Sequence, residues 1–185
     1  MIITITGWPG SGNSSLARLL AKKLGYKHYS GGDMRRKLAN KRGISLPELN
    51  KIGEKESWTD VEVDNFLKEL GKKEDNVVLD AKIGNYLIPN SFKIFLIADL
   101  DVRAKRVFLA KRHEEMFNTI EKVKKALDER VISDKKRYKK YYGIETYTGK
   151  GFDLVIDTTN LNLDTLLETV LKKVSEHKNK NIRKA

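Results

Sequence analysis

The residues best suited to chemistry lie in a glycine-rich segment near the start of the chain, from Gly7 to Ser15. Its glycines and Ser14 fit the spacing G-x-x-x-x-G-K-[ST], which binds phosphates between a strand and a helix. Such glycines let backbone N–H groups turn inward and surround a polyphosphate at the helix N-terminus. We therefore expect a nucleotide-binding loop, with the Ser14 hydroxyl placed for Mg²⁺. The expected nucleotide-binding residues are Gly7, Pro9, Gly10, Ser11, Gly12, Asn13, Ser14 and Ser15.

Position 13 departs from this pattern, because Asn13 stands where the motif has lysine. An asparagine can donate a hydrogen bond, but it brings no positive charge to the β- and γ-phosphates. Losing such a charged donor should cost on the order of several kcal/mol in a phosphoryl-transfer transition state. Three explanations stay open: a substitution introduced into the expressed protein, rescue by another cation, or a protein that binds nucleotide and turns over poorly. The candidate rescuing cations are Lys82 and the arginines of residues 103–137.

The elements that must position this loop are short apolar strands alternating with helices. Strands are expected at residues 2–6, 26–29, 76–80, 92–98 and 152–156. Helical spacing of apolar residues predicts helices at 16–24, 33–41, 101–115 and 118–142, and a last helix through 163–174. Two capping-box patterns, Ser45 with Glu48 and Thr59 with Glu62, predict further helix starts. Residues 176–185 are expected to form a frayed basic tail.

This alternation predicts the α/β class, with a five-stranded parallel sheet covered by helices on both faces in a three-layer sandwich. Ligands of such sheets bind at the carboxyl ends of the strands. The loop and Asp80 both fall at such ends, so we expect them to meet. The length of 185 residues suits one domain, which we expect to span residues 1–175.

Composition excludes several classes of protein. The chain has no cysteine, which excludes a disulfide scaffold, a thiol nucleophile and a thiolate metal site. No apolar stretch approaches the roughly 20 residues needed to span a bilayer. The first residues lack a basic start and a long apolar segment, so we expect no signal peptide and a cytoplasmic protein.

Positive charge is concentrated in two segments. The formal net charge is +12, and residues 103–140 and 172–185 hold the entire excess. A basic patch attracts phosphates, either of a nucleotide or of nucleic acid. An RNA- or ribosome-associated protein with a nucleotide-binding loop therefore stays an alternative, although the tail also fits a solvated lysine-rich surface, and nucleic acid is not the favoured partner.

The ordered segments resemble nucleoside monophosphate kinases, and more narrowly the short cytidylate kinases typical of archaea and some bacteria. The resemblance covers about residues 1–175. It rests on GWPGSGNSSLARLLAKKLGY, SGGDMRRKLANKRGISLPELN, TDVEVDNF, NVVLDAKI, FKIFLIADLDVRAKRV, SDKKRYKKYYGI and FDLVIDTTNL, in that order. Shikimate and dephospho-coenzyme A kinases share the loop and the sheet and are weaker rivals.

The resemblance implies an adenylate-kinase-like fold. A helical region at about 33–70 would bind the acceptor nucleotide, and a lid at about 103–143 would close over ATP. The implied reaction transfers the γ-phosphate of ATP to CMP or dCMP, with Mg²⁺ as cofactor. A nucleotide-binding protein with weak or no activity is the alternative that Asn13 raises. A monomer is expected.

Single residues acquire expected roles from their positions. Asp80, at a strand end, would orient the water shell of Mg²⁺, and Arg36 matches the family arginine that binds the acceptor phosphate. Asp33 is either an N-cap or a substrate ligand. Arg130 and Arg137 lie two helical turns apart and are expected to stabilise charge when the lid closes. Arg35 reads instead as a surface residue.

Two positions at the end of the third strand depart from the family. The family usually reads Asp-Gly-Arg there, whereas this chain reads Asp80-Ala81-Lys82. Lys82 keeps the positive charge of the arginine but cannot make its two-pronged contact. The resemblance places Lys82 among the residues that bind the acceptor. The catalytic set expected from the sequence is Asn13, Asp80, Arg130 and Arg137.

Overall fold

The computed structural model describes residues 1–110 and 117–182, and its strands and helices alternate along the chain. The strands are β1 (Ile2–Gly7), β2 (Lys27–Ser30), β3 (Val77–Asp80), β4 (Phe92–Ile97) and β5 (Leu154–Asp157). The helices are α1 (Asn13–Leu24), α2 (Gly31–Lys41), α3 (Leu46–Gly53), α4 (Trp58–Lys73), α5 (Gly84–Leu87), α6 (Leu100–Leu109), α7 (Ile120–Tyr142) and α8 (Leu163–Ile182). No helix within the described ranges is long and apolar enough to cross a membrane.

The strands of the described chain form one parallel sheet in the order β2-β3-β1-β4-β5. β1 lies in the middle and pairs with β3 on one side and β4 on the other. In the register of the sheet, Asp80 of β3 lies between Ile5 of β1 on one side and Ser30 of β2 on the other. The loop after β1 and the ends of β2 and β3 therefore meet at one edge of the sheet, as the sequence predicted.

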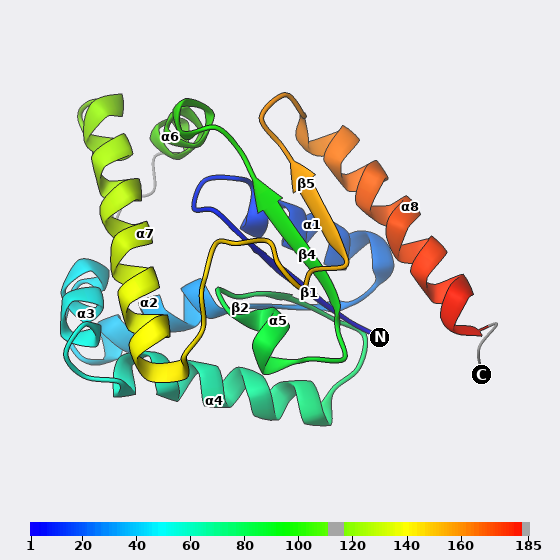
Figure 1. The fold of residues 1–185 in the computed structure, drawn as a ribbon, viewed down its shortest axis with the longest axis horizontal. Helices are drawn as coiled ribbons and strands as arrows, with labels where there is room; N and C mark the ends of the chain where they lie inside the picture. The colour runs from blue at the N-terminus through cyan, green and yellow to red at the C-terminus, as the bar shows by residue number, and fades with distance from the viewer. Residues whose placement is uncertain (111–116, 183–185) are drawn as a thin grey trace.

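Two apolar cores cover the two faces of the sheet (Figure 1). On one face, α1 and α8 pack over Ile3, Ile5 and Ile94. On the other face, α4 and α5 pack over Val77 and Leu79, with α2 and α3 joined to the same core. Side chains of successive strand residues point to opposite faces, which is why the odd-numbered isoleucines of β1 share one core. This arrangement confirms the three-layer α/β architecture.

α6 and α7 form a helix pair beyond the carboxyl ends of the central strands (Figure 1). They pack through a small apolar cluster that includes Ala104, Val123 and Leu127. The C-terminal part of α7 also packs against α2, α3 and α4, because Tyr138 belongs to their apolar core. Residues 111–116 of the expected lid lie outside the described residues.

The structure corrects three local expectations. The Thr59–Glu62 capping box is wrong: α4 begins at Trp58 after Ser57, without a side-chain cap. The frayed tail is wrong as far as Ile182, because α8 continues to that residue and the His177 ring packs 4.7 Å from Phe92. The short helix α5 was not expected at all. The Ser45–Glu48 capping box is confirmed.

Candidate active site

The loop between β1 and α1 presents open backbone donors. Gly10 and Gly12 have φ of 85° and 102°, in the left-handed region that favours glycine. Gly12 is the N-cap of α1 and supplies no side chain to cap the helix, whose first turn carries no acidic residue. The first amides of α1 are therefore available to an anionic ligand, and the helix dipole favours negative charge there.

Arg103 of α6 holds the loop from behind. Its guanidinium donates to the carbonyl oxygen of Pro9 at 3.3 Å and to that of Ala98 at 2.9 Å, and it lies 4.9 Å from the centroid of the Trp8 ring. Its side chain is buried, and burial lowers the pKa of Arg103 below its ordinary value. Trp8 also packs against Tyr147, with centroids 5.1 Å apart. Arg103 thus positions the loop. Its guanidinium is already bound to backbone carbonyls and stacked near Trp8.

Arg106 stabilises the other side of the loop through Thr158. It donates to the Thr158 side chain at 3.0 Å and to the Thr158 carbonyl at 2.6 Å. The Thr158 hydroxyl in turn donates to the carbonyl of Ser11 at 2.9 Å. Thr158, the residue that follows β5, therefore supports the loop. Neither its residue type nor its position in the sequence indicated this role.

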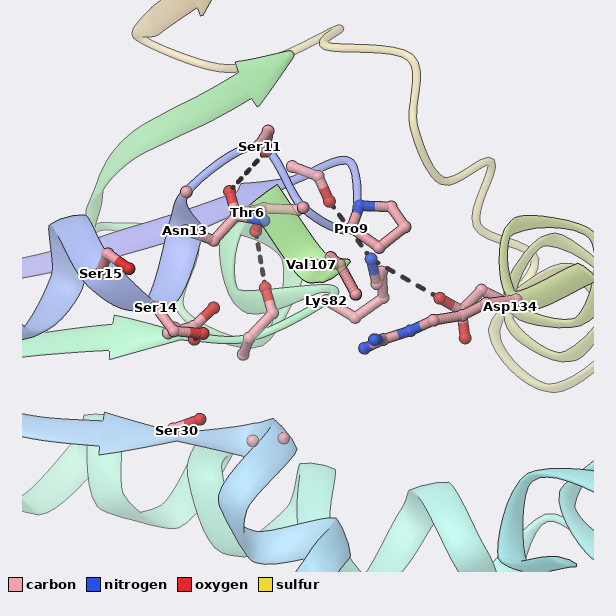
Figure 2. Close-up of a pocket in the computed structure, with 18 of the residues that line it drawn as sticks. Thr6, Pro9, Ser11, Asn13, Ser14, Ser15, Ser30, Lys82, Val107 and Asp134 are labelled. Atoms are coloured by element: carbon pink, nitrogen blue, oxygen red, sulfur yellow. Dashed lines mark hydrogen bonds and ion pairs between the residues drawn. The ribbon is translucent and has the colours of Figure 1, made fainter. Parts of the chain in front are cut away.

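Asn13 bonds within the loop. Its amide nitrogen donates to the Trp8 carbonyl at 3.1 Å, and its amide oxygen accepts from the Ser11 hydroxyl at 3.3 Å. These two contacts close the loop on itself, and Figure 2 shows the one between Ser11 and Asn13. Asn13 therefore supports the loop's shape and brings no charge to it.

Ser14 and Asp80 provide the oxygen atoms that suit a magnesium ion. The Ser14 hydroxyl donates to Asp80 Oδ2 at 2.5 Å. Burial raises the pKa of Asp80, and the bond from Ser14 opposes that rise. Mg²⁺ prefers oxygen ligands, keeps several waters and is usually bound through one or two carboxylates together with substrate phosphates. One hydroxyl and one carboxylate therefore fit a magnesium ion carried by a nucleotide. Among the residues that the structure describes, no group of three or more acidic or histidine side chains could hold a metal ion.

Lys82 extends from the end of β3 to the loop. Its Nζ donates to the Tyr147 hydroxyl at 2.7 Å and to the Gly7 carbonyl at 3.3 Å, and lies 3.6 Å from Asp134 Oδ2. Figure 2 shows the side chain between the loop and Asp134 of α7. Burial lowers the pKa of Lys82 to about 8, although Asp134 favours the charged form.

A buried network of charges joins α2, α4 and α7. Arg137 donates to both oxygens of Asp60 at 2.6 Å each, and it pairs with Asp134. Arg35 donates to Asp60 at 2.5 Å, to the Thr59 carbonyl at 2.8 Å and to the amide oxygen of Asn50 at 2.9 Å. Arg35 is therefore no surface residue, and the sequence-based interpretation of it is wrong. Its helical position could not show that α3 and α4 both close over it.

Asp64 lies in the same region and is buried. Its Oδ2 accepts from the Tyr142 hydroxyl at 2.8 Å. Burial raises the pKa of Asp64 to about 7, helped by the nearby charge of Asp60, while Tyr142 and the arginines oppose the rise. Sequence reasoning missed Asp64, because an acid at this helix position is usually solvated.

A cavity of about 440 Å³ brings the loop, the β3 end and these helices together. It is lined by all the sequence-predicted site residues except Asp33. Asp33 instead bonds Arg36 at 2.6 Å, and its backbone N–H donates to the Ser30 hydroxyl, so Ser30 is the N-cap of α2. The N-cap interpretation of Asp33 is therefore wrong. Arg130, from α7, lines the cavity with Arg137.

The cavity has two ends of different chemistry. One end is the loop, with the amides of α1, Ser14 and Asp80. The other end lies between α2, α3 and α4 and is lined by Arg36, Asn50, Val63, Asp64 and Leu67. An anionic, phosphate-bearing ligand fits the first end, and a second ligand with a flat apolar body and polar edges fits the other.

The cytidylate kinase-like family matches residues 2–160 of this chain. A cytidylate kinase of Sulfurisphaera tokodaii is 37% identical over 172 residues, which is 92% of this chain and 93% of that protein. A cytidylate kinase of Sulfolobus acidocaldarius is also 37% identical, over 100% of this chain and 98% of its own. One of Archaeoglobus fulgidus is 33% identical over 96% and 97% of the two chains.

Solved structures share the fold at low sequence identity. A crystal structure of a protein from Eubacterium ventriosum aligns with a TM-score of 0.69 at 18% identity, covering 95% of this chain and 98% of that one. A shikimate kinase from Bacteroides thetaiotaomicron aligns with a TM-score of 0.65 at 15% identity over the same shares. These likenesses concern the fold alone. The family match over residues 2–160 and the matches to relatives over nearly the whole chain show that the chain belongs to the cytidylate kinase-like family.

Proposed function

We propose that this protein transfers the γ-phosphoryl group of ATP to CMP or dCMP, giving ADP and CDP or dCDP. The observation that carries the proposal is the single cavity that joins the phosphate-binding loop to an acceptor-side region between α2, α3 and α4. Phosphoryl transfer needs two substrates held in line more than it needs covalent help from the protein. A cavity with one phosphate-binding end and one base-sized end supplies that arrangement.

The donor end is assigned to the triphosphate of ATP. Backbone amides at the start of α1 would surround its phosphates, and Ser14 and Asp80 would hold Mg²⁺. When bound there, the ion would neutralise charge on the phosphate oxygens. The chain's own part is to fix the loop whose amides would bind the phosphates, through the buried contacts of Arg103 with Pro9 and of Thr158 with Ser11.

The acceptor end is assigned to the nucleoside monophosphate. Arg36 lines this end of the cavity, where Asp33 positions its guanidinium, and it would bind the acceptor phosphate. An oxygen of that phosphate forms the new bond to the γ-phosphorus as the bond to the bridging oxygen breaks, and ADP leaves with the electron pair. Arg130 and Arg137 also line the cavity and would stabilise the charge on the phosphoryl group as it is transferred.

Asp64 favours an acceptor that carries cytosine over one that carries uracil. Asp64 lines the acceptor end of the cavity and its Oδ2 accepts from the Tyr142 hydroxyl, so we assign its Oδ1 to the acceptor base. Cytosine carries an amino group where uracil carries a carbonyl oxygen. A carboxylate oxygen accepts from the amino group and repels the carbonyl oxygen, which gives discrimination of about 1–3 kcal/mol.

The test is ADP release from ATP with CMP, dCMP, UMP, AMP and GMP as acceptors. We expect CMP and dCMP to give the highest kcat/KM. Asp80→Asn is the negative control, because activity from a contaminating kinase would survive it. ATP binding without acceptor-dependent ADP release by the folded protein would reject the kinase and support the alternative of a nucleotide-binding protein without efficient turnover. A preference for UMP or AMP would reject the choice of acceptor.

A further inference from the structure

The loop of this protein contains no cation of its own. No residue from Gly7 to Ser15 is basic, and Asn13 holds the position of the motif lysine. The Asn13 amide is engaged by the Trp8 carbonyl and the Ser11 hydroxyl. As the γ-phosphoryl group transfers, negative charge grows on the bridging oxygen that ADP retains, and the loop side chains offer it no positive charge.

The Lys82 ammonium lies beside the same part of the loop. It bonds the carbonyl of Gly7 at 3.3 Å. A Cβ on Gly7 would lie 2.5 Å from the Asn13 side-chain oxygen, so Asn13 and Lys82 approach the same loop residue. Figure 2 shows Lys82 reaching the loop from β3, and its side chain lines the cavity.

The charge of Lys82 is only partly compensated by its neighbours. Its carboxylate partner is Asp134, at 3.6 Å, and Asp134 also pairs with Arg137 and accepts from the Tyr147 hydroxyl at 2.5 Å. The Tyr147 hydroxyl and the Gly7 carbonyl, which also accept from Lys82, are neutral. A flexible ammonium held in this way can turn towards a phosphate, since lysine acts as a compact point charge on a long stem.

We propose that Lys82 supplies, from the end of β3, the positive charge that the lysine of the loop motif would supply, and that it contacts the β- and γ-phosphates of ATP. This role replaces the acceptor-binding role that the family resemblance implied for Lys82. The inference rests on the proposed function for its rate effects. As the bond from the γ-phosphorus to the bridging oxygen breaks, the ammonium stabilises the charge left on ADP while the acceptor oxygen forms the new bond.

The test uses wild type, Lys82→Met, Asn13→Lys and the double variant Asn13→Lys/Lys82→Met. We expect Lys82→Met to lower kcat roughly 100-fold, with the KM for the acceptor within about threefold. A loss of kcat without a change in this KM is the pattern left when an interaction made in the transition state is removed. The double variant should recover to within about tenfold of Asn13→Lys, because the lysine introduced at position 13 then serves the phosphates that Lys82 serves in wild type. Lys172→Met, which removes an exposed charge on α8, is the matched control and should leave kcat unchanged.

Two outcomes of the kinetic test would overturn the inference. If Lys82→Met raises the KM for the acceptor and leaves kcat unchanged, Lys82 binds the acceptor and not the phosphates of ATP. A double variant as slow as Lys82→Met would mean that Lys82 acts by holding Asp134 and Tyr147. Asn13→Lys alone leaves Lys82 in place and so tests the idea even if Lys82→Met fails to fold. We expect Asn13→Lys to raise kcat less than about threefold. A gain of about 100-fold or more would show that wild type lacks this positive charge and that Lys82 does not supply it.

Binding separates this inference from the proposed function. Calorimetric titration should show that wild type binds Mg-ATP more tightly than Mg-ADP and that Lys82→Met loses the difference, with the double variant regaining it. If wild type shows this pattern but phosphorylates no nucleotide, the proposed function fails and the role of Lys82 stands. If Lys82→Met keeps both the preference and the activity, the role of Lys82 fails and the proposed function stands.

Discussion

Arg137 of α7 donates through one nitrogen, Nη1, to both carboxylate oxygens of Asp60 of α4, at 2.6 Å each. Both side chains are almost completely buried. The contact joins α7, which is expected to form part of the lid, to α4, which we propose lines the acceptor end of the cavity. Because Arg35 of α2 bonds the same carboxylate, one acid connects three helices around the cavity.

Asp60→Asn should destabilise the protein by about 3 kcal/mol, since removing one partner of a buried pair leaves uncompensated charge. Urea unfolding at pH 7 measures this change. Asp101→Asn is the matched control, because Asp101 pairs with Lys124 at the surface, where such a pair is worth less than about 1 kcal/mol. Equal losses in the two variants would contradict a stabilising role for the Asp60 network.

Asp64 should make stability depend on pH. Burial raises the pKa of Asp64 from its ordinary 3.8 to about 7 in the folded protein, so the folded state binds more protons than the unfolded chain between these pH values. The free energy of unfolding should therefore fall as pH rises from about 4 to about 7. Asp64→Asn removes this dependence and should become more stable relative to wild type by about 2–3 kcal/mol between pH 5 and pH 7.

Urea titrations of both proteins at each pH measure the difference. Glu62→Gln, on the exposed surface of the same helix, is the control and should follow wild type across this range. A difference between Asp64→Asn and wild type that does not change with pH would show that Asp64 titrates with an ordinary pKa.

The fold could be predicted from the sequence because local patterns and tertiary packing agree. The β-branched run of β1 and the helical leucines of α1 each indicate one structure, and Gly25 ends α1 as the pattern requires. The loop was predicted for the same reason: its spacing is contiguous in sequence, and the strand before it and the helix after it are fixed by their own residues.

The remainder of the site depends on contacts between residues far apart in the chain. Arg35 and Asp60 are 25 residues apart, and Arg137 is 77 residues from Asp60, so no local spacing reports their network. The same holds for Thr158, which supports Ser11 from 147 residues away. The sequence could name Lys82 and Arg137 as cations near the site, but only the packing of α7 on the β3 end shows which groups they face.

Arg103 should determine the shape of the loop and, through it, the affinity for ATP. Arg103→Met keeps much of the buried stem but removes the bonds to the Pro9 and Ala98 carbonyls. We expect the Kd for ATP to rise about tenfold, which is about 1.4 kcal/mol, while the Kd for the acceptor stays within about twofold of wild type. Isothermal titration with each nucleotide separately measures both constants, and an equal loss for the two would indicate a general folding defect.

Gly10 should be required for nucleotide binding because of its surroundings as well as its backbone angle. Its φ is +85°, and a Cβ at this position would lie 2.8 Å from the carbonyl oxygen of Arg103, a backbone atom that cannot easily move. Gly143 also has a positive φ, +68°, but a Cβ there would meet nothing within 4 Å. Both alanine variants should therefore carry a similar backbone strain of about 1–2 kcal/mol.

Only the clash at Gly10 should change the loop. We expect Gly10→Ala to raise the Kd for ATP at least about tenfold and Gly143→Ala to leave it unchanged while lowering the urea midpoint. Comparing the Kd of the two variants at matched folded fractions separates the clash from the strain. Equal ATP affinities would mean that the loop can shift away from α6 without losing its phosphate-binding shape, and the support given by Arg103 would then have no functional effect.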